Sequence, residues 1–302
     1  MDKKILIVGS TNTDMVIKTT RFPMPGETIL GGTFFMNPGG KGANQAVAAA
    51  RLGGNVTFVG KIGNDIFGLQ ALNQLKDEGI IVDHIATDLK NPSGIALITV
   101  NEEGENCIIV ASGSNGNLST DDIDLVERVF EESDYILMQL EIPVLTVEYC
   151  AVKASDKGIK VILNPAPARR LSDNLLKHTW LITPNETEAE ILTGIRVCDT
   201  ASAGLAASSL YDKGVKNVII TMGAAGAFVK SESYTGMVPG VKVKAVDTTA
   251  AGDVFNGALA VALAEGIDLK EAVVFANKAA SISVTRLGAQ ASAPYRNEIK
   301  NC

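Results

Sequence analysis

The sequence is poor in the residues that build disulfide frameworks and zinc sites. Its 302 residues include four widely spaced cysteines, with no C-x-x-C pair, and only two histidines. This scarcity argues against either kind of site and is typical of a protein with reduced thiols. No apolar stretch approaches the length of a membrane span, and no signal peptide is recognisable. We therefore expect a cytoplasmic protein without a membrane anchor.

The charge pattern lacks any basic cluster. The 27 Lys and Arg residues are outnumbered by 34 Asp and Glu residues, which gives a formal net charge of −7. A nucleic-acid or anionic membrane partner is therefore not expected. Hydrophobic residues make up 46% and charged residues 20% of the chain, as in globular proteins. The length allows one large α/β domain or two smaller ones.

Strand and helix patterns alternate along most of the chain. Short apolar runs are typical of strands buried on both faces, and the helical spacing of Ile66, Leu69, Leu72 and Leu75 lies between two of them. The pattern predicts an α/β fold with a doubly wound, mostly parallel sheet and helices on both faces. The predicted strands are residues 5–8, 56–59, 135–140, 160–163, 180–182 and 218–220.

Two stretches break this alternation. Residues 94–100 and 105–110 flank a turn-like run and predict a hairpin, while residues 14–20 and 28–35 also look extended. No helices accompany these segments, so we expect a small sheet that stands apart from the main body. An ordinary pair of surface hairpins is the alternative.

The run from Asp247 to Gly257 carries the strongest chemical signal. Residues 241–246 alternate as a strand would, and an apolar helix follows the small residues of the turn. The first amides of such a helix are unpaired and attract negative charge, so the turn forms an anion hole. Asp253 lies inside it, where a carboxylate is suited to accept a proton from a hydroxyl that attacks the anion. An acid that merely suits the helix dipole is the alternative.

A second glycine-rich turn, residues 37–45, also opens a helix. It is not a Walker A loop, because Gly42 follows Lys41 where Ser or Thr would be required. Its glycines allow a ligand to approach closely, and Lys41 and Asn44 offer donors to hydroxyl groups. A tight strand-to-helix turn is the alternative. A third motif, residues 183–188, follows a predicted strand, and its acids could simply be N-terminal helix charges.

In this order and spacing the three motifs resemble the ribokinase family of carbohydrate kinases, also called the PfkB family. The resemblance spans the chain from Gly9 to Gln290. It implies a single ribokinase-like domain over residues 1–302, with a β-sheet lid, residues 14–36 and 94–111, that covers the sugar and joins a homodimer. One departure is Ala250, where much of the family has glycine; this alanine is familiar among ribokinases, and a helical N-terminus tolerates its Cβ.

The reaction that the resemblance implies is the ATP-dependent phosphorylation of D-ribose at O5, which gives D-ribose 5-phosphate and ADP. MgATP and Mg²⁺ are the implied cofactors, with K⁺ as an activator. Asp253 would be the catalytic base, and the amides of Ala250, Ala251, Gly252 and Asp253 would meet the charge on the phosphoryl group. The implied sugar contacts are Asn12, Asp14, Gly40, Lys41, Asn44, Glu141 and Asp253.

The resemblance also assigns nucleotide and metal sites. Glu188 would hold Mg²⁺ through water. For Asn277 a solvated helix position is the alternative. The implied nucleotide contacts are Asn185, Thr221, Gly223, Gly226, Gly252 and Asn277. The implied K⁺ ligands, mostly through backbone carbonyls, are Asp247, Thr249, Ser283, Arg286, Gly288 and Ser292.

Three other functions compete with this one. Another sugar or nucleoside kinase of the family would differ in substrate, although adenosine kinases need an apolar base pocket that these polar residues do not favour. A non-catalytic sugar or nucleotide sensor could share the fold, but it has no use for a base in the anion hole. A dinucleotide-dependent dehydrogenase is excluded, because residues 9–14 lack the G-x-G-x-x-G fingerprint.

Overall fold

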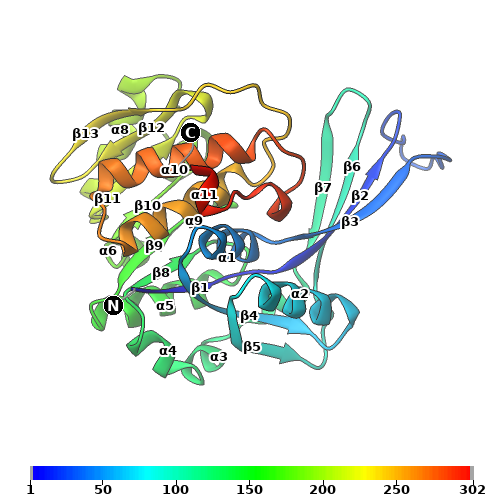
Figure 1. Cartoon of the computed structure of the whole chain (residues 1–302), viewed down its shortest axis with the longest axis horizontal. Coiled ribbons are helices and arrows are strands. Elements are labelled where there is room, and N and C mark those ends of the chain that lie inside the picture. The colour runs from blue at the N-terminus through cyan, green and yellow to red at the C-terminus, as the bar shows by residue number, and fades with distance from the viewer. Residues whose placement is uncertain (1–2, 300–302) are drawn as a thin grey trace.

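The computed structural model describes residues 3–299, whose main body is built on a nine-stranded sheet (Figure 1). Its order is β13-β12-β11-β10-β9-β8-β1-β4-β5, parallel from β11 to β5, with β12 and β13 added antiparallel at one edge. The predicted mostly parallel α/β sheet is confirmed. The strands are β1 (Lys4–Val8), β4 (Asn55–Gly63), β5 (Ile81–Asp88), β8 (Tyr135–Met138), β9 (Lys160–Leu163), β10 (Leu181–Ile182), β11 (Asn217–Thr221), β12 (Gly226–Lys230) and β13 (Thr235–Pro239).

Helices cover both faces of this sheet, as predicted. Alternate strand residues point to opposite faces, so that Ile5 and Leu137 belong to one apolar core and Leu6 and Ile136 to the other. The first core contains residues of α1 (Lys41–Arg51), α2 (Ile66–Asp77), α9 (Ala251–Ala264), α10 (Leu269–Ser283) and α11 (Arg296–Ile299). The second contains residues of α3 (Thr120–Asp124), α4 (Glu127–Glu131), α5 (Val144–Asp156), α6 (Asp173–Lys177), α7 (Glu186–Thr193) and α8 (Thr200–Asp212).

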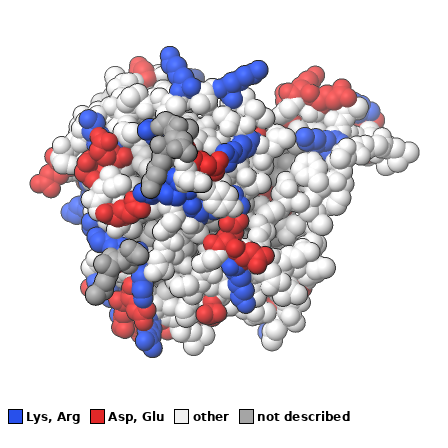
Figure 2. Space-filling model, viewed as in Figure 1, with Lys and Arg blue, Asp and Glu red and all other residues white. Residues whose placement is uncertain are grey.

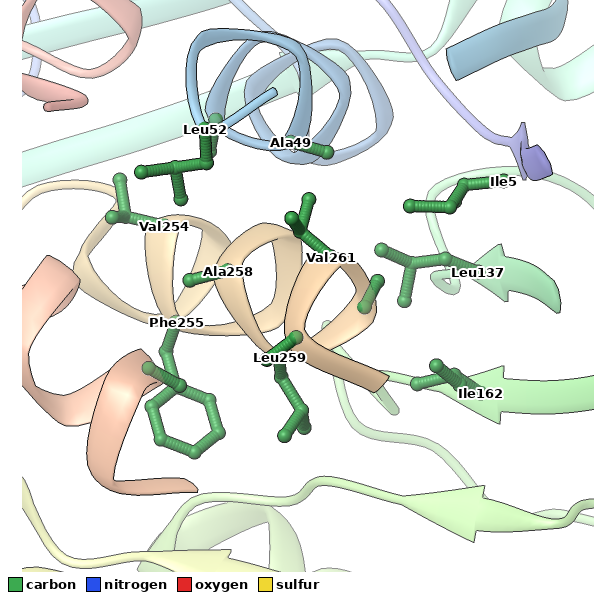
Figure 3. Packing of buried hydrophobic residues seen from close by; sticks show 14 of the residues in the cluster. Ile5, Ala49, Leu52, Leu137, Ile162, Val254, Phe255, Ala258, Leu259 and Val261 are labelled. Atoms are coloured by element: carbon green, nitrogen blue, oxygen red, sulfur yellow. The ribbon is translucent and has the colours of Figure 1, made fainter. Parts of the chain in front are cut away.

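Helices α1 and α9 pack against each other with very little space between their backbones. Figure 3 shows Ala49 of α1 and Leu52, the residue that caps the end of α1, beside the part of α9 that carries Val254, Ala258 and Val261. A Cβ atom on Gly257 would lie 2.7 Å from the carbonyl oxygen of Gln45, so only glycine allows this approach. The contact fixes the first turn of α9 relative to the first turn of α1.

A second, four-stranded sheet extends to one side of the main body (Figure 1). Its order is β3-β2-β6-β7, where β2 pairs antiparallel with β3 and parallel with β6. The four extended segments thus form one small sheet, as predicted, rather than two separate hairpins. Its strands are β2 (Asn12–Lys18), β3 (Thr33–Gly39), β6 (Gly94–Val100) and β7 (Asn106–Ala111). Two statements stay predictions: that this sheet is a lid, and that residues 1–302 form a single domain.

Some of the predicted secondary structure is wrong. Residues 241–246 form no strand, and all six are exposed. They follow β13 in the sequence, and β13 is the edge strand of the main sheet. The alternation in their sequence therefore has no partner strand to pair with. Residues 28–32 also lie outside β3, which runs further toward the second motif than expected. Strands β5, β12 and β13 were not predicted.

Candidate active site

The turn before α9 is tighter than the sequence indicated. Ala250 is the N-cap residue of α9 and adopts a left-handed conformation, with φ 58° and ψ 14°. Within residues 3–299 it is the only residue other than glycine with positive φ. Ala250 thus lies at a helical N-terminus, as expected, but not in a conformation that readily tolerates its Cβ. Its Cβ costs about 1–2 kcal/mol in this conformation, which explains why glycine suits the position.

The turn leaves three of the four predicted amides available to an anion. The amide of Ala251 donates to the carbonyl of Thr248 at 3.2 Å, so it is not free in this structure. Within residues 3–299, the amides of Ala250, Gly252 and Asp253 have no hydrogen-bond acceptor. They lie at the positive end of the α9 dipole, where negative charge is favoured, and their role as an anion hole stays a prediction.

Asp253 is almost completely buried, and helix α1 orients its carboxylate. Asn44 Nδ2 donates to Oδ2 and Gln45 Nε2 donates to Oδ1, each at 2.9 Å. Burial raises the pKa of Asp253, while the charge of Lys41 and the two amide donors lower it. The carboxylate is therefore a stronger base than an exposed one, yet it is held in place by donors that favour its ionised form.

The N-terminus of α1 is packed directly onto the connection between β1 and β2. Gly40 has φ 89°, and a Cβ there would lie 2.7 Å from the amide nitrogen of Asn12. On the other side, Glu141 accepts hydrogen bonds from the Lys41 amide at 3.0 Å and from Ser10 Oγ at 2.6 Å. Three predicted sugar residues, Gly40, Lys41 and Glu141, thus come together at the carboxyl ends of β1 and β8.

Four carboxylates act on Lys41. Burial lowers the pKa of Lys41, but the charges of Asp253, Glu141, Glu188 and Asp14 outweigh this and raise it. Burial and the negative charges of Glu141 and Asp253 raise the pKa of Asp14 to about 7, against a smaller lowering by Lys41. The cluster brings sugar, catalytic and metal candidates from distant parts of the sequence into one electrostatic unit with excess negative charge.

Asn12 is tied to a residue that the sequence did not reveal. Asn115 is buried in the 3₁₀ turn η1 (Gly113–Asn117), and its Nδ2 donates to Asn12 Oδ1 at 2.8 Å and to the Thr11 carbonyl at 3.0 Å. A Cβ on Gly94, the first residue of β6, would lie 2.2 Å from both side chains. The first residues of β2 and β6 therefore meet at Asn115.

Asn185 and Glu188 form a capping box at the start of α7. Asn185 Oδ1 accepts from the Glu188 amide at 2.8 Å, and Glu188 Oε2 accepts from the Asn185 amide at 2.9 Å. The local helix-capping role that the sequence left open is thus real. Burial raises the pKa of Glu188, and Lys41 lowers it. Thr221 lies beside Asn185 at the end of the adjacent strand β11, since its amide donates to the Pro184 carbonyl at 2.9 Å.

The other predicted nucleotide residues lie beyond Thr221. Gly223 has φ 51° with open space around its Cα, whereas Gly226, with φ 104°, packs against the backbone of residues 238–240. Asn277 is buried and its Nδ2 donates to the Pro239 carbonyl at 3.2 Å. The solvated alternative for Asn277 is therefore wrong, and its structural role is to join α10 to the end of β13.

The predicted K⁺ ligands come from two loops that Asp247 connects. Asp247 Oδ1 accepts from the Thr249 amide and Oδ2 from the Gly288 amide, both at 2.9 Å. The Ser283 carbonyl accepts from the Arg286 amide at 3.0 Å, and Ser292 Oγ donates to the Ala289 carbonyl at 2.7 Å. Over residues 3–299, no three His, Cys, Asp or Glu side chains are grouped as a metal site.

Two cavities of about 430 Å³ each border the predicted sugar residues. One lies between the four-stranded sheet and the loops after α10, and is lined by Asp14, Ile98, Asp247 and Gly288 among others. The other is lined by Asn12, Asn115, Glu141 and Arg169 among others. A small ligand therefore has room beside Asp14 in one cavity and beside Asn12 in the other.

Comparison with known proteins agrees with this geometry. The model of the pfkB family of carbohydrate kinases matches residues 2–296. The chain belongs to the PfkB family. This family member is 49% identical to the ribokinase of Haemophilus influenzae over 298 residues, which cover 99% of the chain and 97% of that protein.

Solved structures give the same result for this PfkB family member. The ribokinase of Thermotoga maritima matches with a TM-score of 0.91 and 41% identity, over 99% of this chain and 98% of that one. A ribokinase of Arabidopsis thaliana, solved in complex with ribose and ATP, matches with a TM-score of 0.90 and 32% identity, over 100% and 98%. The predicted carbohydrate kinase is confirmed, and full-length identity to ribokinases supports ribokinase activity. Within residues 3–299, no helix of this kinase is long and apolar enough to cross a membrane.

Proposed function

We propose that this kinase transfers the γ-phosphoryl group of ATP to O5 of D-ribose, giving D-ribose 5-phosphate and ADP. The observation that carries the proposal is the arrangement at the start of α9. There a buried carboxylate, held by two amide donors, lies in the same turn as the free amides of Gly252 and Asp253. A base and an anion hole so close together suit the attack of a hydroxyl on a phosphoryl group.

In the proposed step, O5 of the sugar attacks the γ-phosphorus. The bond from O5 to phosphorus forms while the bond from phosphorus to the oxygen that bridges the β- and γ-phosphates breaks, and ADP takes that electron pair. The proton of O5 passes to the carboxylate of Asp253. The Gly252 and Asp253 amides stabilise the negative charge on the transferred group; losing one such donor typically costs about 10²–10³ in rate.

The residues around Asp253 suit a polyol. Asp14 and Glu141 are acceptors for sugar hydroxyls, and Lys41 and Asn44 are donors. Asn44 Oδ1 is buried and has no partner within residues 3–299, so it is free to accept from a ligand hydroxyl. That the Arabidopsis relative was solved with ribose and ATP supports this pair of ligands.

A divalent cation fits the charge of the site. Four carboxylates and one lysine carry excess negative charge, and ATP would add more. Glu188 is the carboxylate that we assign to Mg²⁺, because this ion prefers carboxylate, phosphate and water oxygens. When bound, the ion would offset the repulsion between the carboxylates of the site and the phosphates of ATP. Asn185, Thr221, Gly223, Gly226 and Asn277 remain our candidates for the nucleotide side.

We also assign K⁺ to the loops that Asp247 joins. Backbone carbonyls of the loop before α9 and the loop after α10 are suitable ligands for a monovalent cation. When bound, the ion would add a second link beside the Asp247 hydrogen bonds and hold the Gly252 and Asp253 amides in place.

The outer face of the four-stranded sheet suits a second copy of the chain. Strand alternation places Ile17, Phe34, Met36, Leu97 and Ile109 on this face, and each is about half exposed or more. Figure 2 shows few charged residues over most of the visible surface of this sheet. Since monomers rarely expose such a patch, we infer a homodimer through the lid. Exposed free cysteines, Cys107 and Cys198, fit our placement of the enzyme in the cytoplasm.

The test of the proposed activity is ADP release with MgATP and a panel of acceptors. The panel contains ribose, deoxyribose, fructose, adenosine, fructose 6-phosphate and no sugar. Ribose should give the highest kcat/KM. A higher value with another acceptor would move the assignment within the family, and no acceptor-dependent turnover would favour the sensor.

A further inference from the structure

Gln45 lies directly behind the proposed base and makes three hydrogen bonds with its side chain. Its Nε2 donates to Asp253 Oδ1 at 2.9 Å and to Asn164 Oδ1 at 3.0 Å, while its Oε1 accepts from Gln139 Nε2 at 2.6 Å. Gln45 is completely buried, and Gln139 and Asn164 are nearly so. Both protons of the Gln45 amide are therefore used inside the protein.

The neighbours allow only one orientation of the Gln45 amide. Asn164 Nδ2 donates to the Thr183 carbonyl at 3.2 Å, so Asn164 must present its oxygen to Gln45. A flipped Gln45 would direct its oxygen at both the Asp253 carboxylate and Asn164 Oδ1, which leaves three acceptors facing one another without a proton. The network thus has a fixed direction, with Gln45 donating to Asp253.

The same network returns to the turn that forms the anion hole. Thr183 Oγ1 donates to Asn256 Oδ1 at 2.6 Å, and Asn256 Nδ2 donates to the Gly252 carbonyl at 2.8 Å. Thr183 and Asn256 are both buried. A continuous path of buried polar groups therefore links the orientation of the Asp253 carboxylate to the peptide group that precedes it.

We propose that Gln45 is a positioning residue for the phosphoryl transfer: it sets the orientation of the Asp253 carboxylate and couples it to the turn at Gly252. Gln45 has no direct role toward sugar or nucleotide in this proposal. The proposal rests on the proposed function, in which Asp253 is the base. Gln45 is uncharged and completely buried, so its role comes only from the hydrogen bonds of its side chain.

The charged groups that act on Asp253 come from four elements. Lys41 lies on α1, Asp14 on β2, Glu141 after β8 and Glu188 on α7. Burial raises the pKa of Asp253, and the Gln45 hydrogen bond is one of the interactions that lower it. Loss of the donor should therefore raise the pKa of Asp253 further, with the four charged groups unchanged.

The test uses the full-length chain with Gln45→Met, which keeps the length of the side chain and removes both donors. We expect kcat to fall about 10- to 100-fold with ribose KM changed less than about threefold, because binding groups stay in place. The acid limb of the kcat profile should move to higher pH. Carboxyl NMR titration of the free protein, with Asp253→Asn to assign the signal, should show the same upward movement without any substrate.

Two further variants separate positioning from stability. Gln139→Met removes the bond that holds Gln45 from behind without touching Asp253, so it should change kcat and the pH profile in the same direction but less. Thr146→Val removes a buried hydrogen bond of α5, from Oγ1 to the Leu118 carbonyl at 2.7 Å, which is not part of the Gln45 network. It should lower the melting temperature and leave the pH profile unchanged.

Clear results would overturn the proposal. Wild-type kcat and an unmoved pH profile in folded Gln45→Met would do so, as would a loss confined to KM. If Gln45→Met does not fold, unchanged kinetics and titration in Gln139→Met would have the same force. Failure of the proposed function is a separate result, because it would appear as absent turnover in the wild type, whereas the carboxyl titration tests the positioning of Asp253 in either case.

Discussion

Strand β8 of the main sheet is buried at every position, whereas β7 of the four-stranded sheet is exposed at every position. The candidate site lies between these two environments. On the side of the main body, Asp253 is fixed by α1 and by the buried amide network. On the other side, Asp14 extends from a thin sheet whose inner face borders a cavity.

This difference indicates a division of labour. Groups that must hold a precise geometry during phosphoryl transfer are built into the densely packed body, where neighbours restrict them. Two of the proposed sugar contacts, Asn12 and Asp14, lie instead on the four-stranded sheet, whose strand β7 is exposed throughout. We propose that the sugar and a second subunit complete the contacts of this sheet. Substitutions in the body should therefore change kcat, and substitutions in the sheet should change KM or assembly.

The largest effect should come from Asp253→Asn. The amide is nearly the same size, so ribose should still bind, but it cannot accept the proton of O5. We expect kcat to fall by about 10²–10⁴, the usual contribution of a general base. Steady-state kinetics with ribose and MgATP, with ribose affinity measured by calorimetry, would check this. A variant that keeps more than half of the wild-type kcat would remove Asp253 from the mechanism.

The next effect concerns the loops that Asp247 joins. Replacing tetramethylammonium with K⁺ at constant ionic strength should raise kcat saturably, with a smaller change in ribose affinity. Asp247→Ala removes the bonds to the Thr249 and Gly288 amides, so it should blunt this rise and lower kcat about tenfold. Equal rates in the two salts would leave the K⁺ assignment without support, although the kinase assignment would stand.

Adjacent residues of β6 offer a matched pair for the four-stranded sheet. Leu97 lies on its outer face, and Ile98 lines the cavity beside Asp14. Leu97→Lys should shift the protein toward monomer in sedimentation, because a charge would be buried at the proposed interface. Ile98→Lys should instead raise ribose KM several-fold and leave the oligomer intact. The same outcome for both variants would contradict the assignment of the two faces.

The smallest effect should be seen in the pH dependence of stability. The pKa of Asp14 is raised to about 7 by burial and by Glu141 and Asp253, from an ordinary value of 3.8. Between these values the folded chain holds a proton that the unfolded chain releases, so the free energy of unfolding should fall as pH rises through this window. Asp14→Asn should remove this loss, and its melting temperature relative to wild type should increase from pH 4 to pH 8. A constant difference would show that Asp14 titrates normally.

Sequence patterns predicted the elements that are buried on both faces. The runs that became β1, β8 and β9 are apolar because helices cover both sides of them. Strand β5 gave a weaker signal, since buried, half-buried and exposed residues are mixed along it. Residues 241–246 gave a false strand signal. Alternation describes the two faces of a strand, but it does not tell whether another strand has a free edge with which the segment can pair.

The same limit applies to the site. The glycine-rich motifs pointed to Asp253 and Lys41, the family resemblance added Glu141, and the charges of both acids do act on Lys41. Gln45 and Asn115 were missed because a neutral amide acquires its role only from its partners, and those partners are distant in sequence. The bond from Gln45 to Asp253 spans 208 residues and the bond from Asn115 to Asn12 spans 103. A signal existed for Gln45, which is a polar residue directly before the apolar run of residues 46–50 in α1.

The pairing of β2 with β6 also constrains how the chain reaches its native state. Asn12 is in register with Gly94, so β2 gains this neighbour only after the intervening β4, α2 and β5 have been synthesised. Closing so long a loop is entropically costly, and such contacts form late in folding. Until then the hairpin of β2 and β3 presents an open strand edge together with Phe34 and Met36. In a nascent or partly unfolded chain, this hairpin is therefore the segment to which other chains, or a chaperone, should bind.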